Sequence, residues 1–190
     1  MSLTVTDLLV PTYRQMLGVL SGWLDKALEQ VGEDNADALM AARLAPDMFP
    51  LATQVRFCCV QALEGISRPR NESLPPLTAE LLEEGRGAGE KPGTLAEAKA
   101  RIAGTLALLE SVSASALDGD SDQPLAHELP NGMVLDLTLG QYARDWALPQ
   151  FFFHVMTAYA ILRSESVPLG KADYVAHLFP FIRPGTIPAS

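Results

Sequence analysis

The fold is decided by one continuous segment near the C-terminal end, Pro149-Gln150-Phe151-Phe152-Phe153-His154-Val155-Met156-Thr157-Ala158-Tyr159-Ala160-Ile161-Leu162-Arg163. At 100° per residue, its polar and small residues gather on one face, and large apolar residues occupy most of the rest. A helix that is apolar nearly all round is contacted on both sides. We therefore predict a helix over about 139–164, with Thr138 as its N-cap, and a homodimer whose interface uses the second apolar side. Pro149 should kink or split this helix.

Three other stretches repeat apolar residues every three or four positions and predict helices over about 11–31, 50–67 and 94–112. Pro11 suits a first helical turn, and Thr94 with Glu97 forms a capping-box spacing. A short helical piece is expected over 36–45. Residues 68–93 are rich in Pro and Gly and predict a long loop, with one or two helical turns at most over 78–84.

A change of pattern over 125–137 predicts a β-hairpin, because Pro130-Asn131-Gly132 separates two short apolar runs. The expected fold class is all-α: an up-down four-helix bundle with a small β-hairpin before the last helix. Residues 1–176 should form the bundle domain. The Pro-rich tail, 177–190, carries enough apolar groups to dock on the body or on a partner subunit.

The composition argues against some classes of function and indicates a cellular location. The chain has 190 residues, 14 Lys+Arg against 23 Asp+Glu, and a formal charge of −9, which disfavours nucleic acid because phosphate contacts need clustered cations. We expect no signal peptide and no membrane span. Cys58 and Cys59 are adjacent, and neighbouring cysteines rarely bridge. They predict buried, reduced thiols and hence a cytoplasmic protein.

His154 is the histidine whose surroundings suggest chemistry. Gln150 precedes it by four residues, the spacing at which two side chains of one helix share a ligand or a metal. The alternative is an ordinary core histidine with its ring nitrogens satisfied. His127 and His177, on the hairpin and in the tail, are expected to be surface residues.

Two motifs carry a resemblance: the segment quoted above, and Arg43-Leu44-Ala45-Pro46-Asp47-Met48-Phe49-Pro50-Leu51-Ala52-Thr53-Gln54-Val55. Together with Gly170-Lys171-Ala172-Asp173-Tyr174, they resemble an uncharacterised family, a domain of unknown function, within the bacterial DinB/YfiT-like metalloenzyme superfamily. The resemblance spans about residues 3–175. It implies a four-helix bundle with a crossover connection, often dimeric, in a superfamily that includes thiol-dependent enzymes.

The resemblance also implies a divalent metal held by three histidines, one on the second helix and an H-x-x-x-H pair on the last. In this chain His154 matches the second member of the pair, and Gln150 occupies the place of the first. The second helix has no histidine, and Asp47 and Gln54 are its nearest polar residues. A zinc or nickel site of His154, Asp47 and Gln150 would therefore be weaker than three imidazoles.

The remaining candidates have two interpretations each. Asp47 could cap the second helix, pair with Arg43, or face His154, and Gln54 could line a cavity or make an interhelical hydrogen bond. Tyr159 and Arg163 share a face with Asp145, which indicates either a structural pairing at a subunit contact or an anion site at Arg163.

Two functions remain open. The first is a dimeric bundle that binds a small ligand in an inter-helix pocket near His154, lined by candidates among Asp47, Gln54, Gln150, Tyr159 and Arg163. The second is a diverged metal-assisted enzyme, a hydrolase or a thiol-dependent transferase or isomerase, acting on a small molecule.

Overall fold

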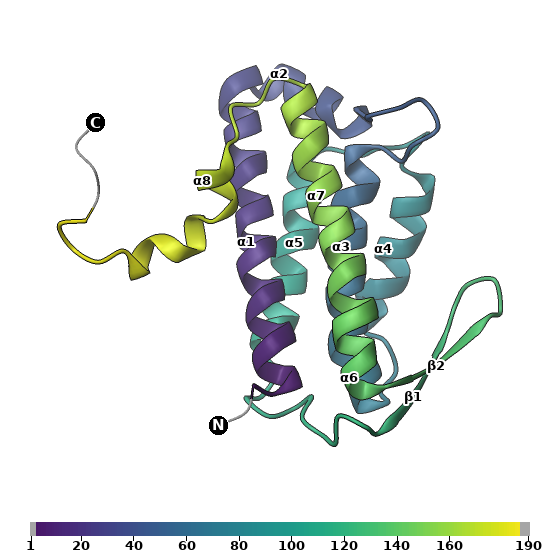
Figure 1. The fold of residues 1–190 in the computed structure, drawn as a ribbon. Coiled ribbons are helices and arrows are strands. Elements are labelled where there is room, and N and C mark those ends of the chain that lie inside the picture. Colours follow the sequence, from purple (N-terminus) through teal and green to yellow (C-terminus); the bar gives the residue numbers. More distant parts are fainter. Residues whose placement is uncertain (1–2, 187–190) are drawn as a thin grey trace.

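The computed structural model describes residues 3–186, which are mostly helical with one small antiparallel hairpin (Figure 1). The long helices are α1 (Val5–Val31), α3 (Leu51–Ser67), α4 (Pro76–Gly87), α5 (Leu95–Glu110) and α7 (Leu148–Ser164). The short ones are α2 (Glu33–Ala36), η1 (Asp37–Ala41), η2 (Arg68–Arg70), α6 (Leu139–Gln141), η3 (Tyr142–Ala147), α8 (Lys171–Tyr174) and η4 (Ala176–Phe181). Within the described range, no helix is both long and apolar enough to cross a bilayer.

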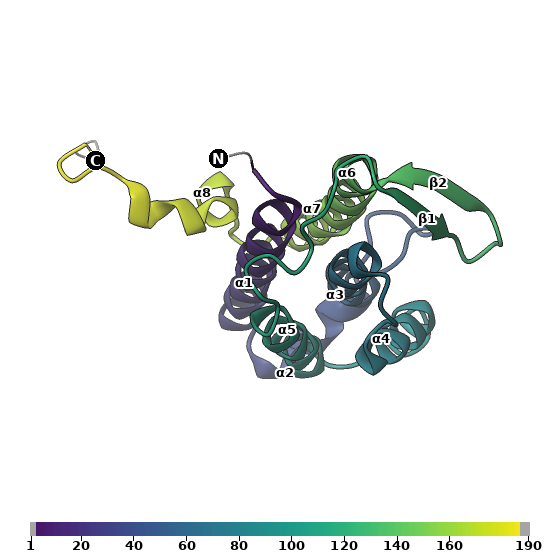
Figure 2. The same cartoon turned by 90° about the horizontal axis from the view of Figure 1, so that it is seen from below.

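Helix α3 lies at the centre, between α7 on one side and α4 and α5 on the other (Figure 2). Nearly every one of its side chains is buried. Helix α1 closes the arrangement by packing on α5 and α7, and Tyr13 meets Phe151 edge to face with 4.8 Å between ring centroids. The predicted helical class with a small hairpin is thus confirmed.

The loop predicted over 68–93 is wrong, because its middle forms the helix α4, which packs along α3. Pro76 takes the first helical position, where a missing N–H costs nothing. Gly85, which suggests a loop in the sequence, lies inside the helix. A Cβ there would come within 2.5 Å of the Phe57 ring, so the glycine allows the two helices to approach.

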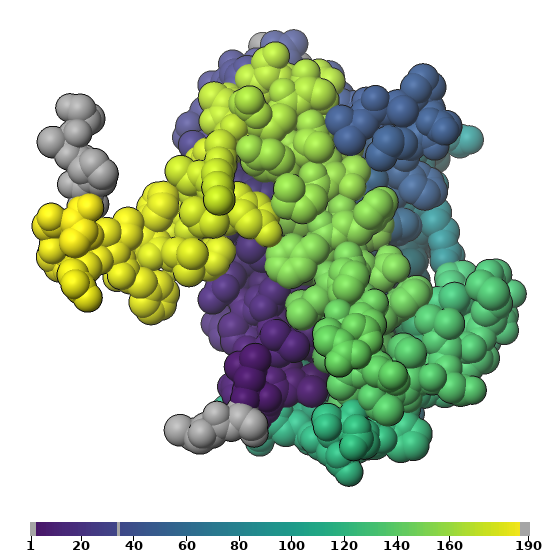
Figure 3. All heavy atoms as spheres, viewed as in Figure 1, coloured from purple at the N-terminus to yellow at the C-terminus, as the bar shows by residue number. Residues whose placement is uncertain are grey.

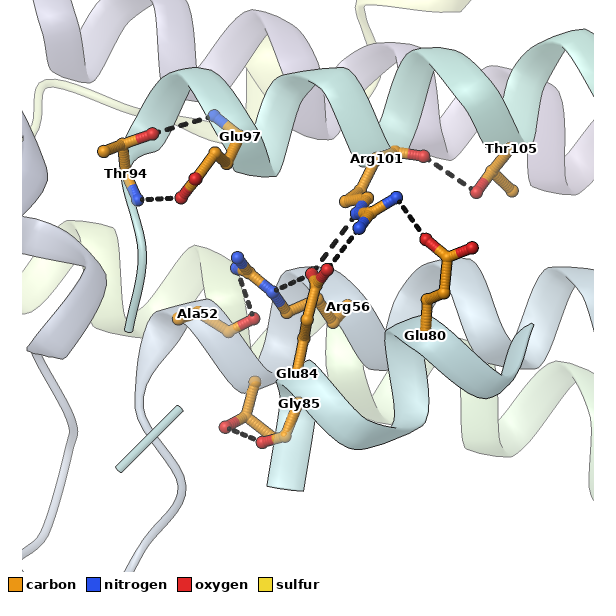
Figure 4. Close-up of polar contacts among 10 residues, drawn as sticks. Ala52, Arg56, Glu80, Glu84, Gly85, Thr94, Glu97, Arg101 and Thr105 are labelled. Atoms are coloured by element: carbon orange, nitrogen blue, oxygen red, sulfur yellow. Dashed lines mark hydrogen bonds and ion pairs between the residues drawn. The ribbon is translucent and has the colours of Figure 1, made fainter. Parts of the chain in front are cut away.

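An ionic cluster fastens α4 to the bundle (Figure 4). Arg56 of α3 donates to Glu84 Oε2 over 3.0 Å, and Arg101 of α5 pairs with both Glu84 and Glu80. Burial would raise the pKa of the Glu84 carboxyl, but hydrogen bonds from the two arginines outweigh it and lower that pKa. The cluster is therefore structural: one carboxylate joins three helices.

The first helix begins at Val5 rather than at Pro11. Thr4 and Asp7 form a reciprocal capping box there, with Thr4 Oγ1 accepting from the Asp7 N–H over 3.1 Å. Pro11 lies inside the helix, and its missing donor removes one backbone bond. The third predicted helix start is confirmed, since Thr94 and Glu97 form the same kind of box.

The helix predicted over 139–164 is split, as expected from Pro149. After the Thr138 N-cap and α6, residues Tyr142–Ala147 form a π-helical turn, and α7 begins at Leu148. Leu148 N–H donates to Ala143 O, five residues back. Because Pro149 has no N–H to give, the preceding turn widens before the regular helix resumes.

The predicted hairpin is confirmed as β1 (Pro124–Glu128) paired with β2 (Val134–Thr138), with His127 opposite Leu135. The prediction that His127 is a surface residue is wrong, since it is only 3% exposed. The ring lies 5.5 Å from that of Tyr142 and 4.7 Å from that of Trp146. An isolated hairpin is marginal, and this one gains stability by packing on the helices.

Cys58 and Cys59 are free and fully buried, as predicted. Burial raises the pKa of the Cys59 thiol to about 12, which makes it a poor nucleophile. The tail segment η4 contacts α1 and then extends away from the helices (Figures 1 and 3), and Phe181 in it is 82% exposed. Residues 187–190 of the predicted tail lie outside the described part of the chain, and the boundary at residue 176 stays a prediction.

Candidate functional site

A groove of about 860 Å³ opens beside α7. Its floor is α3, its far wall is α4, and its ends are the loop before α3 and the hairpin. Figure 3 shows the surface hollowed between that loop and the hairpin. The apolar part of the lining is partly aromatic and partly aliphatic, and Phe49 and Phe153 remain 51% and 59% exposed. This size suits a small-molecule site.

His154 lies in this groove and is held there by Gln54. Its Nδ1 is 2.9 Å from Gln54 Oε1, and the Gln54 amide nitrogen donates to the carbonyl of Phe49 over 3.3 Å. Phe57 and Phe153 flank the imidazole edge to face, each with 5.3 Å between centroids. The predicted hydrogen bond between the second and last long helices is therefore present, and it positions the ring.

The Gln54 amide determines the histidine tautomer. Because its nitrogen is committed as a donor to Phe49, its oxygen accepts, and His154 Nδ1 must carry the proton. Nε2 is then the unprotonated nitrogen. It has no hydrogen bond within residues 3–186, so the groove presents one free imidazole acceptor.

Burial lowers the pKa of His154 to about 4. The imidazole is therefore neutral near pH 7, and so weak a base takes few protons from a substrate. At neutral pH the unprotonated Nε2 of His154 can accept a hydrogen bond from an O–H or N–H group of a ligand.

Three side chains that line the groove, from near its hairpin end, each contain a buried nitrogen. Arg68 Nε, Trp146 Nε1 and His127 Nδ1 have no hydrogen-bond partner among the described residues, and all three side chains line the groove. Burial, and secondarily the Arg68 charge, lower the pKa of His127, so that ring is neutral too.

Two of the other predicted residues do not line the groove. Asp47 is exposed in the loop before α3 and does not line the groove. The interpretation of Asp47 as an N-cap is wrong, because Pro50 takes that position without a side-chain cap. Gln150 is half-buried one turn before His154 and is likewise absent from the groove lining.

Tyr159 and Arg163 lie elsewhere on α7. Tyr159 packs edge to face on Trp23 with 5.3 Å between centroids, and Arg163 donates to the carbonyl of Val167 over 3.3 Å. Asp145, expected on their face, instead pairs with Arg144. Tyr159 is therefore a half-buried residue that packs against the core, and neither Tyr159 nor Arg163 lines the groove.

The residues around His154 fit a divalent metal poorly. In the described part of the chain, no three His, Cys, Asp or Glu side chains converge as metal ligands would. The donors near His154 are glutamine amides, which are neutral and weak, and the Gln54 oxygen is already bonded to Nδ1.

Sequence reasoning did not identify Arg68, Trp146 or His127 as site residues. Arg68 follows the last residue of α3, Trp146 lies in the π-helical turn, and His127 is on β1. Because these residues are far apart in the sequence, the sequence alone does not show that they line the same groove. One structural feature does mark Trp146: it lies in a π-helical turn, and such turns occur often at functional sites.

Comparison with known proteins places the chain in a family. A family model for a domain of unknown function, DUF1993, matches residues 5–175. A DinB family member protein from Shewanella denitrificans, known from its crystal structure, is 30% identical with a TM-score of 0.71, covering 96% of this chain and 95% of its own. No curated protein matches. The chain therefore belongs to the DUF1993 family of unknown function and is similar in sequence and structure to a DinB family protein.

Proposed function

We propose that this chain is a cytoplasmic, dimeric, up-down four-helix bundle that binds a small, partly aromatic ligand in the groove at His154. The observation that carries the proposal is a groove of about 860 Å³ whose lining is partly aromatic and includes a neutral imidazole fixed by Gln54. Ligand sites of this kind combine apolar walls with a few fixed polar groups.

The electrostatics favour binding over acid-base catalysis. A histidine with a pKa of about 4 is a hydrogen-bond acceptor at neutral pH rather than a proton acceptor. The buried thiols of Cys58 and Cys59 lie in the core and do not line the groove. We therefore assign the groove a recognition role.

The test is ligand-observed NMR with 2-naphthol and with 2-methoxynaphthalene, which has the same rings but no O–H. We expect 2-naphthol to bind more tightly and His154→Leu to abolish that preference. Gln61→Trp, which places an indole in the groove, should abolish binding of both. Glu83→Trp, at an exposed position of α4 outside the groove lining, is the matched control. If Gln61→Trp binds both probes as the wild type does, the groove is not the site.

The dimer would use the apolar side of α7 that faces away from the core. Phe153 and Met156 are 59% and 43% exposed there, and clustered exposed apolar groups mark association surfaces. Light scattering at micromolar concentration should give twice the mass of one chain. A monomer at that concentration would contradict the proposal.

The metal-assisted alternative has its own test. We expect purified protein dialysed against zinc or nickel to retain no stoichiometric ion. A double variant, Gln54→His with Gln150→His, adds two imidazoles beside His154 and should gain zinc affinity. Stoichiometric metal in the wild type, lost in His154→Ala, would instead support a diverged metalloenzyme.

A further inference from the structure

A loosely spaced ion pair lines the groove. Glu64 Oε1 lies 3.7 Å from a terminal nitrogen of Arg68, which is longer than a hydrogen bond, and both side chains belong to the groove lining. Within residues 3–186, neither the Glu64 carboxylate nor the terminal nitrogens of Arg68 take part in a hydrogen bond. Both charged groups therefore keep their hydrogen-bonding capacity for a ligand.

The charged atoms of the pair are accessible. The side chain of Glu64 is 16% exposed and that of Arg68 is 33% exposed. Arg68 Nε is buried, whereas the two terminal nitrogens and both oxygens of Glu64 retain accessible surface. Glu64 belongs to α3, whose other sides pack on α1, α4, α5 and α7. The open part of its side chain therefore faces the groove that it lines.

A ligand that satisfies both groups carries both charges. The carboxylate of Glu64 accepts hydrogen bonds from an ammonium group, and the guanidinium of Arg68 donates them to a carboxylate. A ligand with a single charge would bring that charge close to the like-charged member of the pair. In an α-amino acid the ammonium and carboxylate groups are attached to the same carbon, so their spacing resembles the 3.7 Å of the pair. A zwitterion laid antiparallel to the pair brings each charge to its opposite.

The Glu64 charge is incompletely compensated by Arg68. Burial raises the pKa of the Glu64 carboxyl, and the Arg68 charge opposes that change without reversing it. A second cation beside the carboxylate would favour its ionised form. An ammonium group is therefore favourable at Glu64 even with Arg68 adjacent.

The rest of such a ligand would lie along α3 toward His154. Phe57, which meets the His154 ring edge to face, precedes Glu64 by seven residues, or about 10 Å of helix. A para-hydroxyphenyl amino acid with a hydrogen bond at each end spans a comparable length. Its ring would lie against the aromatic part of the lining, and its O–H would donate to His154 Nε2.

We infer that the groove binds a zwitterionic aromatic α-amino acid, with its ammonium group at Glu64 and its carboxylate at the terminal nitrogens of Arg68. This inference rests on the proposed function, since it names the ligand class for the same groove. The pair recognises the amino-acid end of the ligand, and the aromatic lining with His154 recognises its side chain.

The test compares L-tyrosine with two analogues at pH 7 by ligand-observed NMR titration. Tyramine lacks the carboxylate, and 4-hydroxyphenylpropionate lacks the ammonium group. The wild type should bind L-tyrosine at least about tenfold more tightly than either analogue, because each lacks one charged hydrogen-bonding group. In Glu64→Gln, L-tyrosine and the propionate should bind equally, whereas in Arg68→Gln, L-tyrosine and tyramine should bind equally. Glu128→Gln and Arg86→Gln, which remove exposed charges lining the same groove, are the matched controls and should keep both preferences.

The outcomes separate the two proposals. Equal binding of the three probes by the wild type, or preferences that survive Glu64→Gln and Arg68→Gln, would overturn the amino-acid assignment and leave the groove as a ligand site. Failure of all three probes while the naphthalene probes bind would also overturn this assignment alone. Failure of every probe would overturn the proposed function itself. Thermal unfolding of each variant without ligand shows that it is folded before its affinity is interpreted.

Discussion

Acid should destabilise this protein through His154. In the folded chain burial lowers the pKa of that imidazole from 6.5 to about 4. Above pH 6.5 the ring is neutral in both the folded and unfolded states, so its contribution to the free energy of unfolding is complete. As the pH falls through 6.5 the unfolded chain takes up a proton that the folded chain refuses until about pH 4. Stability is therefore lost between pH 6.5 and pH 4.

The magnitude follows from the size of the shift. One pKa unit corresponds to about 1.4 kcal/mol, so the full loss at low pH is about 3 kcal/mol. At pH 5 the same relation gives a loss of about 2 kcal/mol relative to pH 7.5. That is a large fraction of the roughly 5–15 kcal/mol that stabilises a typical domain.

The assay is urea unfolding followed by circular dichroism at pH 7.5, 6 and 5, for the wild type and for His154→Gln. Glutamine does not titrate and can still donate to the Gln54 oxygen. His127, whose pKa burial also lowers, is present in both proteins and cancels in the comparison. We expect the wild type to lose about 2 kcal/mol more than the variant between pH 7.5 and pH 5. Equal losses in the two proteins would refute the reasoning.

Two further predictions concern packing, with urea midpoints as the measurement. Gly65→Ala should lower the free energy of unfolding by about 1–3 kcal/mol, because its Cβ would lie 2.2 Å from the Tyr13 hydroxyl oxygen. Gly104→Ala should raise the free energy of unfolding by about 0.5–1 kcal/mol, because the nearest atom to its Cβ is 3.6 Å away. A Gly65→Ala protein as stable as the wild type would contradict this close approach. Glu84→Gln should lower the free energy of unfolding by about 2 kcal/mol, because it leaves a buried arginine unpaired. Glu83→Gln, at an exposed position of the same helix, should change that free energy little. Equal effects of the two substitutions would show that the ionic cluster does not stabilise the fold.

Much of the fold was predictable because it depends on local patterns. The Thr94 capping box, the Asn-Gly hairpin and the split at Pro149 each involve residues within a few positions of one another. The errors have non-local causes. Helix α4 was missed because Gly85 is favourable only when the Phe57 ring occupies the space beside it, which the sequence does not display.

The candidate site, like the fold, was only partly predictable from the sequence. His154 could be identified from its helical spacing, and an interhelical hydrogen bond of Gln54 was among the expected alternatives, although its partner, His154, was not. His127 was placed on the surface because a hairpin residue usually lies there. Its burial depends on where the hairpin packs.

The sequence by itself determined the helical class and the positions of most of the predicted helix ends, because these are properties of residue type and spacing. Only the tertiary structure decided that Gln54 fixes the His154 tautomer, that Asp47 stays outside the groove, and that Arg68, His127 and Trp146 line it. The reason is physical: a side chain's burial and its hydrogen-bond partner depend on packing between segments, whose register is set by the whole core.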